Sequence, residues 1–287
     1  MIGCERDGSA WREETISELV WQAARPYVMY ADFTRHQEAA VGADWLWWWV
    51  DHTGECFGML VQAKRLHCQG SNWTIDFRTN KSEQMRRLFR TANLFSVPAA
   101  YVLYMGSVDY RASFSCGPDH HARCEPCRKA SVSVMAGLLA SMTSPSPRDG
   151  ANEALNSSVP LENLADPGAE PGPIYDLNLR NTDGDLRTFL LERQSGAKRI
   201  ARTMFDAVSN VRSGMLSQDV ADHIDTDRDA VFCDVPLDSA HFGVSYFSHM
   251  LRGLRREVPS YVQDVLAGQV PPRSVTAHVS GIVVVRC

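Results

Sequence analysis

The sequence predicts an α/β protein, in which helices and strands alternate along the chain. Residues 45–64 read as two strands of alternating side chains joined by a short turn. Residues 85–95 carry apolar side chains at helical spacing, and residues 99–105 form an apolar run between turn signals, which is typical of a buried strand. An amphipathic helix is predicted before them, over residues 12–25, with Pro26 at its end. The predicted order is therefore helix, two strands, helix and strand.

Composition narrows the class of protein. The chain has 287 residues, enough for one large domain or two small ones, and a formal net charge of -5. No global basic field attracts nucleic acid, so a nucleic-acid-binding function would need a local basic patch. The sequence contains no secretion signal, no apolar run of about 20 residues and no secreted pattern among its eight cysteines. We therefore expect a cytoplasmic protein with reduced thiols and no membrane partner.

The hairpin over residues 38–65 carries the candidate chemistry. Because strand side chains alternate between faces, Asp44 on the first strand shares a face with Gln62 and Lys64 on the second. The turn over residues 51–55 contains a Thr-Gly pair that suits chain reversal. The opposite face carries bulky side chains that are expected to bury together, namely Trp45, Trp47, Trp49, Phe57, Met59 and Val61.

The tryptophans of this hairpin have two interpretations. Four tryptophans in five positions can stack on nucleic-acid bases, or they can fill a core with their large rings. We favour the core for Trp45, Trp47 and Trp49. Trp48 shares the face of Asp44, so it is the candidate among the four for lining a substrate groove.

The three polar residues on one face have a joint chemical meaning. The Asp44 carboxylate and the Gln62 amide oxygen are hard ligands of the kind that Mg2+ prefers. The Lys64 ammonium can orient a water and offset charge on a phosphoryl transition state. Phosphate-binding loops and serine-nucleophile motifs are absent from the sequence.

This D…QxK arrangement resembles the PD-(D/E)xK nuclease superfamily, in the branch that contains Mrr-like restriction enzymes. It is also similar to an uncharacterised bacterial family with the pattern E-[DE]-T, then E…GADW, then QAKR. The resemblance covers about the first half of the chain. It implies a restriction-endonuclease-like core with a mixed central sheet between helices, and DNA hydrolysis that depends on Mg2+ or Mn2+. RNA is the less expected substrate, and a role in restriction or anti-phage defence follows from the resemblance alone. Gln62 departs from the acidic residue usual at its position, which implies weaker metal binding.

Two further acids are candidates under this resemblance. Glu13 on the first predicted helix matches a glutamate that faces the metal site, although it can equally stabilise the positive end of its helix. Glu38 matches an acid that binds a second metal or a water, and its alternative is a surface carboxylate. The predicted catalytic set is thus Asp44, Gln62, Lys64 and Glu13, with Glu38 as a further metal ligand.

The predicted helix after the hairpin carries several basic residues. Together with Arg65 they form a local patch that suits phosphate contacts, or else a solvated helix face. Gln84 lies where some superfamily members place a glutamine near the site. The candidate nucleic-acid-binding residues are Arg65, Lys81, Arg86, Arg87 and Arg90.

Residues 116–127 are rich in metal-binding side chains. Cys124 and Cys127 have zinc-knuckle spacing, and Cys116 with His120 or His121 would complete four ligands. The alternative is a loop of unpaired thiols, because a second well-spaced pair is missing. A structural Zn2+ is therefore one of two interpretations.

Three segments follow from these patterns. A nuclease-like core is predicted over residues 1–142 and ends in a helix over 128–142, an exposed Pro/Ser/Gly-rich connection over 143–173, and an α+β extension over 174–287. The extension is predicted to contain helices over 200–211 and 247–254 and a strand over 279–285. Substrate selection, packing on the core and homodimer formation are three alternative roles for this extension that the sequence leaves open.

The leading functional hypothesis is a Mg2+-dependent DNA endonuclease. The alternative is a catalytically inactive nuclease-like module that binds nucleic acid or a protein partner. A third interpretation is an α/β protein of another role in which the QAKR string is a coincidence.

Overall fold

The structure is a computed structural model that describes most of the chain. The described residues are 28–32, 45–69, 72–77, 79–107, 109–110, 125–143, 147–164, 182–211, 229–232, 235 and 246–287. None of the helices within these ranges is long and apolar enough to cross a membrane.

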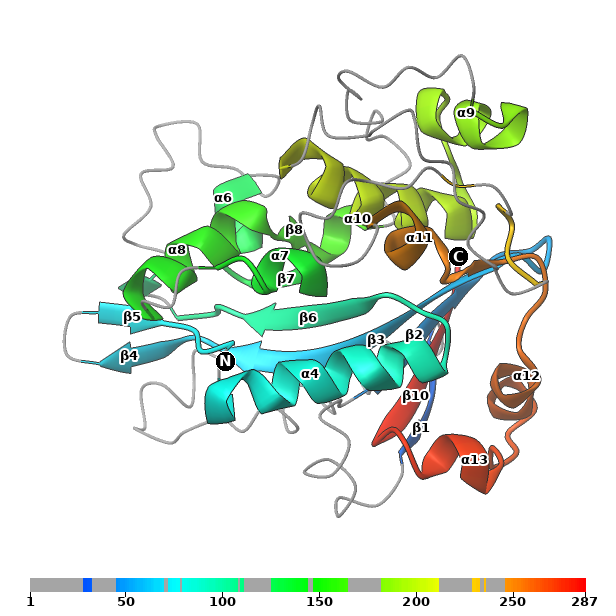
Figure 1. The fold of residues 1–287 in the computed structure, drawn as a ribbon. Coiled ribbons are helices and arrows are strands. Elements are labelled where there is room, and N and C mark those ends of the chain that lie inside the picture. Colours follow the sequence, from blue (N-terminus) through cyan, green and yellow to red (C-terminus); the bar gives the residue numbers. More distant parts are fainter. Residues whose placement is uncertain are drawn as a thin grey trace.

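A mixed β-sheet forms the centre of the molecule, with helices packed on it (Figure 1). The strand order is β1-β10-β2-β3-β6-β7-β8, and β9 pairs with β3 outside this path. Two pairs, β10 with β2 and β3 with β6, are parallel, and the other pairs are antiparallel. The strands are β1 (Val28–Asp32), β2 (Trp45–Val50), β3 (Cys56–Arg65), β6 (Ala99–Tyr104), β7 (Val132–Ala136), β8 (Val159–Pro160), β9 (Leu254–Arg255) and β10 (Gly281–Arg286). These features confirm the predicted α/β class and its mixed central sheet.

Helices lie on both sides of the sheet, with α4 on one side and α10 on the other (Figure 1). A small two-stranded sheet, β4 (His67–Gln69) with β5 (Asn72–Thr74), extends from the end of β3. The helices are α4 (Thr79–Leu94), α6 (Glu125–Lys129), α7 (Gly137–Ala140), α8 (Pro147–Ser157), α9 (Gly184–Leu191), α10 (Gly196–Val211), α11 (Tyr246–Leu251), α12 (Ser260–Leu266) and α13 (Arg273–Thr276), with a 3-10 turn at Leu161–Asn163.

The predicted hairpin is confirmed in its described part. β2 and β3 are antiparallel, with Trp45 opposite Val61 and Val50 opposite Cys56. The Asp51 carboxylate accepts hydrogen bonds from the Thr53 amide at 2.9 Å and from the Thr53 hydroxyl at 2.6 Å, which stabilises the turn. Gly54 follows with a φ of 89°, a conformation that favours glycine. Local turn chemistry therefore fixes the register that aligns β2 with β3.

The tryptophans of β2 belong to the core, including the one that was expected to line a groove. Trp48 is 0% exposed, so that prediction is wrong. Its indole lies over Gly58 of the paired strand, where a Cβ atom would come within 2.7 Å of the ring. Tyr261 of α12 contacts it edge to face with ring centroids 6.1 Å apart, and the Arg255 guanidinium lies 5.9 Å from its ring centre. Residues far away in sequence therefore cover this face of β2.

The C-terminal half contributes to the same sheet as the predicted core. β10 lies between β1 and β2, and Val283 is paired with Trp47 in the parallel register. Arg252 donates hydrogen bonds to the Val97 carbonyl at 2.8 Å and to the Asn93 side chain at 2.6 Å, and these groups flank the end of α4. The division into residues 1–142 and 174–287 is thus not a division of the sheet, and the C-terminal half also holds α4 in place.

Two predicted elements differ from those observed. Residues 132–136, expected within a helix, form β7, because pairing with β6 and the burial of all but Val132 outweigh the local helical pattern. Residues 147–164, expected in an exposed connection, form α8, β8 and a 3-10 turn, with Ala154 and Leu164 almost completely buried. Composition indicated a loop there, but tertiary packing folds the segment.

Candidate functional site

Lys64 and Gln84 meet at the end of β3. The Lys64 Nζ donates a hydrogen bond of 2.8 Å to the Gln84 Oε1, and both side chains are half-buried. Lys64 is the ninth residue of β3, and Gln84 lies in the second turn of α4, which packs on the same strand. The strand and the helix together hold an ammonium group in a fixed position near the surface.

Gln62 lies two residues before Lys64 on β3, so alternation puts it on the same face. It is 2% exposed, and Tyr101 of β6 is its partner in the parallel register. The two side chains thus differ in depth: Gln62 is buried within the sheet face, whereas Lys64 is reached more easily from solvent.

The predicted carboxylates lie outside the described residues. This applies to Asp44, Glu13 and Glu38. Asp44 directly precedes Trp45, the β2 residue opposite Val61, and Gln62 is the next residue along β3. In the part of the chain that the structure describes, no three His, Cys, Asp or Glu side chains gather as a metal site would require. The metal ligand set therefore stays a prediction.

His67 and Asp76 are neighbours of this site that the sequence analysis missed. Partial burial, together with the positive charges of Arg65 and Lys64, lowers the pKa of His67, and the negative charge of Asp76 opposes this shift. A lowered pKa favours the neutral imidazole at pH 7. In the sequence, His67 lies three residues after Lys64, which is a signal that could have indicated it. No spacing predicts that Asp76 lies near His67.

Two arginines of the predicted basic patch are paired with an acid of the same helix. Both Arg86 and Arg87 form ion pairs with Glu83, one turn earlier on α4, at 3.1 Å and 3.2 Å. These hydrogen bonds to the two arginines lower the pKa of Glu83. Arg90 is exposed and Arg65 is half-buried, while the side chain of Lys81 lies outside the description. Glu83 is not among the residues predicted from the sequence, because a basic patch is predicted from its basic residues alone.

Residues 4–286 match DUF6615, a family of unknown function. The chain belongs to this family. No curated protein and no solved structure matches it. The match covers every described helix and strand of this DUF6615 protein, from β1 to β10, so it includes the β3–α4 site and the C-terminal half alike.

The zinc prediction for the DUF6615 protein falls almost wholly outside the described residues. Cys127 lies in α6 and is half-buried. Its predicted companions Cys116, His120 and Cys124 are not described, nor is His121. The zinc site thus stays a prediction.

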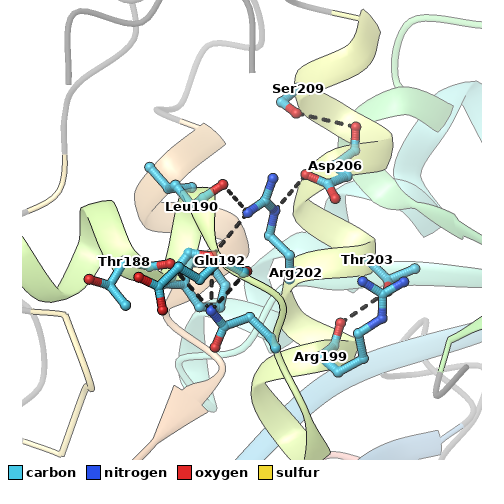
Figure 2. Close-up of polar contacts among 10 residues, drawn as sticks. Thr188, Leu190, Glu192, Arg199, Arg202, Thr203, Asp206 and Ser209 are labelled. Carbon is cyan, nitrogen blue, oxygen red and sulfur yellow. Dashed lines mark hydrogen bonds and ion pairs between the residues drawn. The ribbon is translucent and has the colours of Figure 1, made fainter. Parts of the chain in front are cut away.

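A second charged cluster of the DUF6615 protein lies between α9 and α10 (Figure 2). Arg202 is 0% exposed, and its Nε donates a hydrogen bond of 2.7 Å to Asp206 one turn later on α10. Its guanidinium also donates to the backbone carbonyls of Phe189, at 2.9 Å, and Leu190 at the end of α9. A helix C-terminus carries partial negative charge, so a buried cation is stabilised there. This cluster joins two helices and its cation is closed to solvent, which gives it a structural role.

Proposed function

We propose that this DUF6615 protein is a metal-dependent nuclease that hydrolyses phosphodiester bonds of DNA. The observation that carries the proposal is the Lys64–Gln84 contact of 2.8 Å on the face of β3 that also presents Gln62. A cation at an accessible strand end, aligned by a neutral amide, suits the orientation of a water or phosphate. The restriction-endonuclease-like core and the role in restriction or anti-phage defence belong to the same proposal, through the resemblance of the D…QxK pattern.

Each residue has a distinct role in this proposal. Asp44 and the Gln62 amide oxygen would hold Mg2+ or Mn2+, with Glu13 and Glu38 as further ligands, and the ion supplies positive charge to the phosphate in the transition state. Lys64 orients the attacking water and offsets negative charge. Gln84 fixes the position of the Lys64 ammonium, since its amide oxygen accepts a hydrogen bond from that group.

The burial of Gln62 constrains how it can act. A side chain that is 2% exposed does not touch a large substrate directly. It can serve as a ligand to a small ion that lies between it and the substrate, with its buried amide oriented by the strand. A neutral ligand contributes less affinity than a carboxylate, so we expect weak metal binding that depends on the acids.

A non-catalytic module that binds nucleic acid or a protein partner is the second candidate function. The observation that favours it is the set of basic residues on α4, which includes the exposed Arg86 and Arg90. Such a module would use the basic residues of α4 for binding and leave the substrate intact.

Cleavage assays with the full chain separate the two functions. The nuclease should nick plasmid DNA in Mg2+ or Mn2+, stop in EDTA, and lose activity at least about 100-fold when Asp44 is replaced by Asn. Asp185→Asn, at an exposed position of α9, is the matched control and should keep full activity. If the wild-type chain leaves both DNA and RNA uncut with either ion, the nuclease proposal is wrong and the binding module remains a candidate.

A further inference from the structure

Glu83 bridges two arginines on the solvent side of α4. One carboxylate oxygen accepts from Arg86, whose Nε and terminal nitrogen lie 3.2 Å and 3.1 Å from it. The other oxygen accepts from the Arg87 Nε at 3.2 Å. Two guanidinium groups that donate to the same anion also form an arrangement that binds phosphate.

The position of this cluster connects it to the Lys64 site. At 100° per residue, Arg87 lies about 60° around the helix from Gln84, and Glu83 lies about 40° beyond Arg87. Gln84 in turn contacts Lys64. Around the helix the order is therefore Gln84, Arg87, Glu83 and, about 60° further, Arg86.

We propose that Arg86 and Arg87 bind a backbone phosphate of the nucleic-acid substrate, and that Glu83 occupies this phosphate position until the substrate displaces it. The inference rests on the proposed function and adds to it a substrate-contacting site and the residue that limits its affinity. Glu83 acts as an internal competitor: it lowers the net charge of the three side chains from two positive charges to one.

The exposure of the cluster makes displacement feasible. The side chains of Arg86, Arg87 and Glu83 are 57%, 42% and 36% exposed, so water and salt screen their ion pairs. Exposed ion pairs of this kind contribute little to stability. A phosphodiester can therefore replace the carboxylate without disturbing α4, whose packing depends on Leu88 and Ala92, both 0% exposed.

Helix stabilisation is the alternative explanation of these ion pairs, since acids and bases at i, i+3 and i+4 support many helices. Binding separates the two explanations. If Glu83 only stabilises α4, its removal leaves the affinity for nucleic acid unchanged or lowers it. If Glu83 competes with phosphate, its removal raises that affinity.

The test is Glu83→Gln, which keeps the size of the side chain and removes its charge. The matched control is Glu55→Gln, because Glu55 pairs with Lys198 at 2.8 Å and its loss changes the net charge equally. Glu55 directly precedes β3, about 30 Å from Lys64 along the strand. Binding is measured by fluorescence anisotropy with a labelled DNA duplex in EDTA, where no cleavage occurs, over a range of salt concentrations.

Glu83→Gln should bind the duplex about 3- to 10-fold more tightly at low salt, with a steeper salt dependence, and Glu55→Gln should bind like the wild type. In a chain that also carries Arg86→Ala and Arg87→Ala, the gain from Glu83→Gln should disappear. Equal affinity of Glu83→Gln and Glu55→Gln would overturn the inference, and so would a gain that persists without the two arginines. Neither result bears on cleavage by the wild type, so failure here is distinguishable from failure of the nuclease.

Discussion

Two cations of this protein, Lys64 and Arg202, each link two elements of the fold, yet their surroundings differ: Lys64 joins β3 to α4, and Arg202 joins α10 to α9. Arg202 is completely buried and donates to a carboxylate and to two backbone carbonyls at a helix end. Lys64 is half-buried and donates to a neutral amide. A buried cation that already donates to a carboxylate and two backbone carbonyls is not accessible to a ligand from solvent. A half-buried cation near the end of a strand can still be reached by a substrate from solvent.

Removal of the buried cation Arg202 should have the largest effect on stability. Arg202→Met leaves Asp206 and the α9 carbonyls without their donor, so the free energy of unfolding should fall by about 3 kcal/mol. Urea denaturation followed by circular dichroism measures the change. Arg256→Met is the control, because Arg256 is exposed and donates to the Val231 carbonyl at 3.2 Å. It should change stability by less than about 0.5 kcal/mol, and equal effects of the two substitutions would contradict the structural role of Arg202.

A substitution at Gln84 tests how Lys64, the other cation, is positioned. Gln84→Ala removes the acceptor that positions Lys64, so cleavage should slow about tenfold through kcat, with KM little changed. The control is Gln263→Ala, since Gln263 of α12 donates to the Val258 carbonyl at 2.8 Å in an exposed position. The thermal midpoint should stay similar in both variants. A loss of stability that accounts for the lower activity would show that Gln84 acts in folding and not in positioning.

The smallest expected effect concerns His249, which is buried like Arg202. Its Nε2 accepts a hydrogen bond of 3.3 Å from the Ala99 amide, which requires the neutral ring. Burial and the charge of Arg252 hold the pKa of His249 well below its ordinary value. The unfolded chain therefore binds more protons below about pH 6.5, and this part of the stability is present above that pH and lost as pH falls.

Between pH 8 and pH 6 the free energy of unfolding of the wild type should fall by about 1 kcal/mol more than that of His249→Gln. Unfolding at a series of pH values measures the difference, in which the contributions of other titrating groups cancel. Parallel pH profiles for the two proteins would mean that His249 titrates normally in the folded state.

Local patterns predicted the elements but not their long-range pairing. The alternation in β2 and β3, the turn at Asp51 and the apolar run of β6 are short-range signals, and the structure has all three. The strand at β10 was predicted, but its place between β1 and β2 depends on contacts across more than 200 residues. Periodicity within a segment contains no information about such partners.

The candidate site shows the same limit. Alternation placed Gln62 and Lys64 on one face, and the superfamily resemblance placed Gln84 of the following helix near them, but neither predicted their depth. Trp48 was assigned to the accessible face by its parity alone, and it is buried because Gly58, Arg255 and Tyr261 enclose it. Glu83 was overlooked since a count of basic residues takes no account of the acid one turn away.

The most direct test of the central claim compares two lysines in the same cleavage assay. Lys64→Met removes the cation of the proposed active site, whereas Lys198→Met removes a cation that pairs with Glu55 at 2.8 Å beyond the opposite end of β3. With Mg2+ and plasmid DNA, Lys64→Met should lose at least about 100-fold in cleavage rate while Lys198→Met keeps the wild-type rate. If Lys64→Met cleaves DNA as fast as Lys198→Met, the β3–α4 face is not the active site.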